Sequence, residues 1–227
     1  SMRGTLLLCV VLAACGTNTR PGGSGLPDGG GGTGDTGGGG GGDGSTGQQV
    51  YVYAQTASTL YRVDPDTLAI TKVGDFVWPS SVISDQMTDI AIDKNGQMIG
   101  VSYSRVYRVD PNNAQTVLLS SSLGGTFNGL SFVPAAMLGM TGDDVLVGTE
   151  NNDGKVFEID PMTGNKTQVG DMGASFASSG DLVAVEGFGT VQTVLGSSSD
   201  VLATLAPQTF AAAPAASATG FDMIWGV

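Results

Sequence analysis

From residue 50 onward the chain alternates short apolar runs with turn residues, and one pattern returns at regular intervals. The sequence Leu-Tyr-Arg-Val-Asp-Pro at 60–65 recurs in similar form at 106–111 and 156–161, and a worn copy without the aspartate lies at 202–207. The repeats are spaced by about 46 residues. Each copy predicts a β-strand that ends at a proline turn, where the Asp side chain can bond the turn amides.

Further strands are expected in each repeat. One set has a small residue at its third position, which indicates close approach by a neighbouring sheet; it lies at 52–55, 98–101, 146–149 and 194–197. Another set lies at 89–92, 129–132, 181–184 and 222–225. Asn95-Gly96 supplies a hairpin turn with positive φ. With a last strand after each proline turn, four short strands fall in about 46 residues, the period of a β-propeller blade.

The order of strands at the two ends predicts how such a ring closes. Residues 50–76 supply the second, third and fourth strands of a blade but no first strand, whereas residues 221–227 supply a first strand with nothing after it. Pairing the two completes a blade. We therefore expect an all-β propeller of about four four-stranded blades over residues 50–227, closed by its C-terminal strand. An open array of four blades, or two chains pairing into a larger ring, are the alternatives.

These repeats resemble those of bacterial extracytoplasmic propellers of the YVTN and quinoprotein-like kind, and closure at four blades is similar to that of hemopexin domains. The resemblance covers residues 50–227 and implies a fold rather than an activity. The fourth repeat departs from the pattern, because Ala206 replaces the turn aspartate and the following run at 210–216 is a weak strand sequence.

The residue pattern of the N-terminus predicts an export signal. Arg3 precedes a nine-residue apolar run, which is far too short to span a bilayer. Its end, Leu12-Ala13-Ala14-Cys15, resembles the lipobox of bacterial lipoproteins, which implies that residues 1–15 are a signal peptide with a lipobox and that Cys15 becomes the acylated first residue. A secretory signal with a chance cysteine is the alternative. Gly16 lacks the aspartate that commonly retains such proteins at the inner membrane, which favours the cell envelope at the outer membrane.

Residues 16–49 form a low-complexity segment in which glycine is the commonest residue. So few apolar residues cannot build a core, and we expect a disordered linker that tethers the domain to the lipid. Its glycines do not predict a phosphate-binding loop, because no strand precedes them and no helix follows.

Charge and composition exclude several kinds of partner and active site. The net charge of -12 repels phosphate backbones, so nucleic acid is not an expected partner. The chain has no histidine, and both of its cysteines, Cys9 and Cys15, lie in the leader. Residues 50–227 therefore contain no Ser-His triad, thiol nucleophile, disulfide or His/Cys metal site.

One group of polar residues falls at equivalent places in the expected first strands. Asp89, Asp181 and Asp222 share a register, and Asn128 stands beside it in the remaining blade. Because first strands line a propeller's channel, these side chains are candidates for a Ca²⁺ or Mg²⁺ site near the axis. The alternative is that each Asp bonds amides of the next blade and fixes blade packing.

Trp78, in the long connection at 76–86, is a candidate for binding a sugar or a protein side chain, or else it covers the core. No catalytic residues are identified. The sequence thus predicts a membrane-anchored lipoprotein whose non-catalytic propeller meets a protein or carbohydrate ligand. The alternative is a Ca/Mg-dependent hydrolase or lyase of the lactonase-like propeller type.

Overall fold

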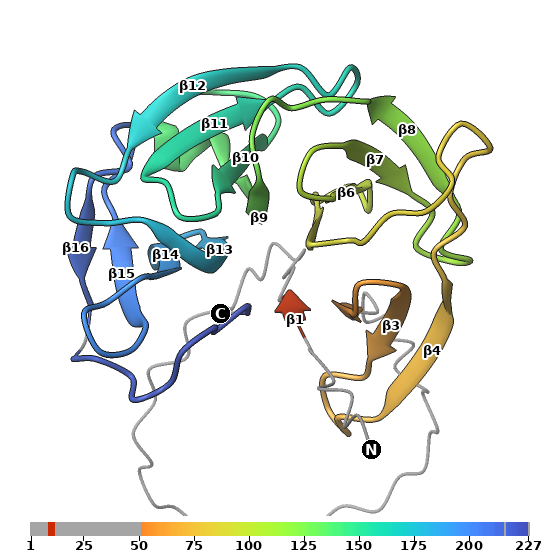
Figure 1. The fold of residues 1–227 in the computed structure, drawn as a ribbon, viewed down its shortest axis with the longest axis horizontal. Coiled ribbons are helices and arrows are strands. Elements are labelled where there is room, and N and C mark those ends of the chain that lie inside the picture. Colours follow the sequence, from red (N-terminus) through yellow and green to blue (C-terminus); the bar gives the residue numbers. More distant parts are fainter. Residues whose placement is uncertain (1–8, 12–50, 216, 227) are drawn as a thin grey trace, which may run out of the picture.

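The computed structural model describes residues 9–11, 51–215 and 217–226, and its regular structure is almost entirely β-strand. Four antiparallel sheets of four strands each are arranged in a ring (Figure 1). The predicted all-β propeller of four four-stranded blades is therefore confirmed. A single short 3-10 turn, η1 (Ala135–Leu138), occurs among the described residues, and no helix there is long and apolar enough to cross a membrane.

The strands follow the chain from blade to blade. Blade one contains β1 (Cys9–Val11), β2 (Val52–Gln55), β3 (Thr59–Val63) and β4 (Ile70–Asp75). Blade two contains β5 (Asp89–Ile92), β6 (Met98–Val101), β7 (Val106–Val109) and β8 (Thr116–Ser120). Blade three contains β9 (Phe127–Val133), β10 (Val145–Glu150), β11 (Lys155–Ile159) and β12 (Lys166–Asp171). Blade four contains β13 (Ser178–Val185), β14 (Gly189–Val194), β15 (Val201–Leu205) and β16 (Ala212–Pro214).

In every blade the strands lie in chain order, with the first strand near the axis and the fourth at the rim (Figure 1). The inner strand β9 contacts both β5 and β13, and β1 lies beside β5. The first strands therefore line the centre, as the repeat pattern predicted.

The proline turns form as expected. The Oδ1 atom of Asp64 accepts the amides of Asp66 (3.0 Å) and Thr67 (2.8 Å). Asp110 accepts the Asn112 amide in the same way, and Asp160 the amide of Met162. Each carboxylate thereby satisfies backbone donors that the strand ladder leaves unpaired.

The same turn persists in blade four, where the aspartate is lost. The residue four positions after the Asp, or after Ala206, has a left-handed backbone in all four repeats: Leu68, Ala114, Gly164 and Phe210, with φ of 58°, 59°, 71° and 57°. In each case its amide donates to the carbonyl at the start of the turn. The turn in blade four therefore keeps the same backbone geometry without the aspartate side chain that supports it in the other blades.

Blade four differs from its prediction in one strand. Its second strand is β14 (Gly189–Val194), whereas the position of the small residue Gly196 predicted 194–197. Gly196 instead lies outside the strands, where a side chain would collide with the Ser199 carbonyl. The four residues Val191–Val194, all buried, decide the register in place of the glycine.

Buried apolar side chains form three clusters, each at the junction of two neighbouring blades. Their main members are Tyr53, Leu60, Ile90 and Tyr107 between blades one and two; Ile99, Val101, Phe127 and Leu130 between blades two and three; and Val133, Val147, Leu182 and Leu205 between blades three and four. Among the described residues no such cluster joins blade four to blade one. The ring is thus held by three apolar interfaces.

The closing strand is the main departure from the sequence prediction. Blade one is completed by β1 (Cys9–Val11), which pairs antiparallel with β2 so that Cys9 lies opposite Gln55 and Val11 opposite Tyr53. Residues 221–226 form no strand. The expectation that the C-terminal strand closes the ring is therefore wrong for this structure, because β1 occupies the edge of β2.

The C-terminal segment is bound instead to the end of blade four. The Ile224 amide donates to Asp200 Oδ2 (2.8 Å), and Thr193 Oγ1 donates to the Ile224 carbonyl (3.0 Å). Gly180 makes this approach possible, since a Cβ there would lie 2.9 Å from the Trp225 Cα and collide with the Ile224 carbonyl. The end of the chain lies near the centre of the ring, close to β1 (Figure 1).

The tight packing at Gly148 on β10 yields a stability prediction. A Cβ at this position would lie 2.8 Å from Ile159 Cδ1 and 3.1 Å from Phe127 Cδ1. We expect Gly148→Val to lower the free energy of unfolding by about 1–3 kcal/mol through overpacking, measured by urea denaturation. Ser121→Val, at an exposed position, is the control. Equal effects of Gly148→Val and Ser121→Val would contradict the packing account.

Candidate functional site

Two of the four residues predicted to lie near the axis are in contact there. Asp89 begins β5 and Asp181 lies on β13, and both side chains are almost completely buried. Burial, followed by the charge of Asp181 and a hydrogen bond with it, raises the pKa of Asp89 well above the ordinary value. This shift favours a protonated carboxyl group on Asp89 beside the Asp181 carboxyl group.

Backbone amides fix these carboxyl groups. Asp89 Oδ1 accepts the amide of Ile90 (2.8 Å), and its Oδ2 accepts that of Leu130 on blade three (2.6 Å). Asp181 Oδ1 accepts the amide of Leu182 (2.6 Å). Asp89 thus binds blade two to blade three, which supports the interpretation that the aspartates fix blade packing.

Asn128 belongs to a separate buried network between blades three and four. Its Nδ2 donates to Asn151 Oδ1 (3.2 Å), and its Oδ1 accepts from Ser178 Oγ (3.0 Å). The Gln192 amide donates to Ser178 Oγ and to Thr149 Oγ1, both at 2.8 Å. The Asn128 oxygen is therefore committed to the protein and is a poor ligand for an ion.

Asp222 does not join the pair, because it is exposed on the C-terminal segment. Within 51–215 and 217–226, no three or more acidic, His or Cys side chains gather into a group that could hold a metal ion. This arrangement gives the predicted Ca²⁺ or Mg²⁺ site no shell, and the enzyme hypothesis that depended on it gains no support here.

Trp78 packs inward. Its ring lies 5.0 Å from the Tyr107 ring and 5.6 Å from the Phe76 ring, against the cluster between blades one and two. The structure favours the interpretation that Trp78 covers the core. Cys15 lies outside the described residues.

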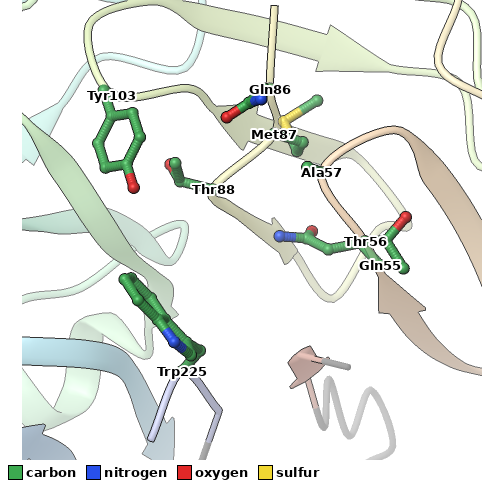
Figure 2. Close-up of a pocket in the computed structure, with 8 residues that line it drawn as sticks. All are labelled: Gln55, Thr56, Ala57, Gln86, Met87, Thr88, Tyr103 and Trp225. Atoms are coloured by element: carbon green, nitrogen blue, oxygen red, sulfur yellow. The ribbon is translucent and has the colours of Figure 1, made fainter. Parts of the chain in front are cut away.

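A pocket opens at the mouth of the ring, where blades one and two meet the C-terminal segment (Figure 2). Its volume is about 130 Å³, and its lining is uncharged: Gln55, Thr56, Ala57, Gln86, Met87, Thr88, Tyr103 and Trp225. The Gln55 amide points into the space between Thr88 and Trp225 (Figure 2). Gln55 is 2% exposed, and its Oε1 has no hydrogen-bond partner among the described residues.

Asp85, directly before the pocket residues Gln86–Thr88 in the chain, holds the outer wall of the pocket in place. Asp85 Oδ2 accepts from the Tyr107 hydroxyl (2.6 Å) and from Arg105 Nη1 (3.0 Å). Burial alone would raise the pKa of Asp85, but the hydrogen bonds from Tyr107, the Gln86 amide, Ser102 and Arg105 together lower it. On the blade-three side, the Thr88 hydroxyl donates to the carbonyl of Phe127 (2.8 Å). The segment between Asp85 and Thr88 is therefore fixed at both ends.

Sequence reasoning missed this pocket. None of its residues belongs to a chemical motif, and they come from four separate stretches of the chain. The one available signal was Gln55, a polar residue that ends a strand whose other positions are apolar or aromatic.

No protein-family model matches the chain, and no curated protein matches it. Among solved structures, a protein of unknown function from Bacteroides thetaiotaomicron is similar at 16% identity and TM-score 0.52, over 78% of this chain and 50% of that one. Regucalcin, a calcium-binding protein from Agrobacterium tumefaciens, is 12% identical over 72% and 55% of the two chains, with TM-score 0.47. BamB from Moraxella catarrhalis is 11% identical over 71% and 44%, with TM-score 0.40. The chain spans about half the length of these proteins, and the likeness shows the fold alone.

The raised pKa of Asp89 makes stability depend on pH. The folded protein keeps a proton on Asp89 above the pKa of an unfolded Asp, near 3.8, so stability should fall as the pH rises from that value through the raised pKa, by at most about 1.4 kcal/mol per pH unit. Asp181→Asn removes the charge of Asp181 but not the burial of Asp89, so stability should fall over a narrower pH range.

The measurement is the melting temperature between pH 4 and pH 9. Asp143→Asn, which removes one exposed carboxylate, is the control and should keep the slope of the unmodified protein. An unchanged pH dependence in Asp181→Asn would show that Asp181 does not raise the pKa of Asp89.

Proposed function

We propose that this protein is an exported lipoprotein, anchored in the cell envelope through Cys15, whose propeller binds a small neutral ligand without transforming it. The pocket at the mouth of the ring carries the binding part of the proposal. Its buried Gln55 Oε1 lacks a donor, and a buried acceptor left without one costs about 1–3 kcal/mol. A ligand hydroxyl or amide N–H would recover that energy.

The lining favours an uncharged ligand. All eight pocket residues are neutral, so a charged group entering the pocket would lose its hydration without gaining a partner of opposite charge. Met87 and Ala57 offer apolar surface, and Tyr103 offers an aromatic ring that is 39% exposed. A hydroxyl donor beside an apolar face is the chemistry of a sugar ring, so a neutral saccharide unit is the ligand class that fits best.

The volume sets the size of the ligand. A space of about 130 Å³ is smaller than the 300 Å³ or more typical of pockets that enclose a drug-sized ligand. The pocket therefore suits one small ring or the terminal unit of a longer glycan.

Binding is tested on the lipoprotein purified in detergent, by titration with methyl β-glucoside and with methyl β-glucuronide. We expect the neutral sugar to bind and the charged one not to. Gln55→Leu, which keeps the side-chain volume but removes the acceptor, should weaken binding about tenfold, equivalent to one hydrogen bond.

The control is Gln168→Leu, the same change at an exposed position of β12. The binding proposal fails if neither sugar binds, if the glucuronide binds as well as the glucoside, or if Gln55→Leu and Gln168→Leu have the same effect.

The anchor is tested by growing cells that express the full chain with an alkyne-tagged fatty acid. The chain should incorporate the label and lose the mass of residues 1–14, whereas Cys15→Ala should do neither. Cys9→Ala is the matched control and should stay labelled. A label that persists in Cys15→Ala, or is absent from every variant, rules out a lipid at this position.

A further inference from the structure

The strand that completes blade one belongs to the segment that processing would remove. β1 (Cys9–Val11) lies within the apolar leader, upstream of Cys15. Once residues 1–14 are cleaved, as the proposed function requires, β2 loses its partner on the side of the axis. Its four residues are all buried, so an open edge would leave their unpaired amides and carbonyls inside the ring.

A second segment of the chain has the sequence of an inner strand. Residues 222–225 (Asp-Met-Ile-Trp) repeat the pattern of 89–92 and 181–184, in which an Asp precedes three apolar or small residues. In the observed ladders Ile90 lies opposite Gly100, and Leu130 opposite Gly148. The corresponding residue of β2 is Ala54, now opposite Val10, and Met223 is the counterpart of Ile90.

The present position of this segment is unfavourable. Met223 has a left-handed backbone with φ of 57°, a conformation that is uncommon for residues other than glycine. Its side chain is 70% exposed, and that of Phe221 is 71% exposed. By contrast, Ile90 and Leu182, which hold the equivalent position in blades two and four, are each 1% exposed. Moving Met223 into that position would bury it and allow an extended φ.

The segment is also close to the edge that it would fill. Trp225 and Gln55 line the same pocket, so the C-terminal residues already lie beside the end of β2 (Figure 2). The segment's hydrogen bonds to blade four include those of Ile224 with Asp200 and Thr193 and that of the Phe221 carbonyl with the Asp200 amide.

We propose that the edge of β2 is a binding site for the chain's own C-terminal segment, which replaces β1 as the inner strand of blade one when the leader is removed. The ladders of the other blades set the register: Asp222 opposite Gln55, Met223 opposite Ala54, and Trp225 opposite Val52. Strand exchange closes the ring with a strand that the mature protein keeps.

The exchange has two consequences for the axis. Asp222 moves to the level of Asp89 and Asp181, where each Asp accepts the amide of the residue that follows it. Trp225 moves to the far end of β2 and no longer lines the pocket, so removal of the leader changes one wall of the pocket.

The test is a disulfide across the proposed ladder in the full chain. Val52→Cys with Trp225→Cys places two thiols on opposing residues, and Cys9→Ala in every variant removes the competing leader thiol. After oxidation, the processed lipoprotein should form this disulfide within one chain. Cys15→Ala, which keeps the leader and β1, should not form it.

A proline substitution tests the strand exchange independently of the cleavage on which the proposal rests. Val10→Pro in the Cys15→Ala background disrupts β1 without cleavage, because proline cannot donate in the ladder and is excluded from strand interiors. We expect the disulfide to form in this variant too. If the leader is never cleaved but the proline variant forms the disulfide, the lipoprotein proposal fails while the strand exchange stands.

The control shifts the pair by one residue. Tyr53→Cys with Trp225→Cys should stay reduced, because neighbouring residues of a strand point to opposite faces. The inference is overturned if the Val52/Trp225 pair stays reduced in both the processed and the proline chains, if the shifted pair reacts equally well, or if the disulfide joins two chains, in which case a second copy supplies the strand.

Discussion

The structure depends on hydrogen bonds to the backbone along the axis-facing edge of the second strand in each blade. In each blade the second strand is hydrogen-bonded on one side to the third, and its remaining amides and carbonyls point toward the axis, where neighbouring blades exclude water. β5, β9 and β13 meet this demand for blades two, three and four from residues adjacent in sequence. In blade one a distant segment, β1, supplies the inner strand.

The rest of the ring follows from where burial is apolar and where it is polar. Three apolar clusters fix the four blades in order, whereas the axis is polar and held by specific hydrogen bonds. Asp89 links two blades through their backbone amides, and burial and the contact with Asp181 raise its pKa. No apolar cluster joins blades four and one among the described residues; the C-terminal segment binds to blade four there, and Trp225 reaches the pocket between blades one and two.

The sequence predicted those parts of the fold that repeat. The strand-and-turn unit recurs four times, so its blade number, its strand order and the Asp turns at 64, 110 and 160 could be foreseen from spacing alone. Repetition failed where one copy had diverged: the glycine at 196 predicted a strand that Val191–Val194 forms instead. It also misplaced the closing strand, because periodicity cannot show that a segment outside the repeats, Cys9–Val11, pairs with the edge of β2.

The site was less accessible to such reasoning. The shared register of Asp89 and Asp181 predicted their meeting at the axis, but the sequence could not show that backbone amides already occupy their oxygens. The pocket is assembled from loops of two blades and the C-terminal segment, so no local pattern marks it. Gln55 shows the reason: its importance comes from a missing partner in space, which no spacing along the chain records.

The most direct measurement of the central claim is residue-resolved hydrogen exchange of Val52–Gln55 in the protein after the proposed removal of residues 1–14. If the edge of β2 must be filled, its axis-facing amides should exchange as slowly as those of Met98–Val101 in β6, and they should lose this protection when residues 222–225 are replaced by Gly-Ser-Gly-Ser. Rapid exchange of these amides in the shortened protein with its natural C-terminal segment would contradict the account.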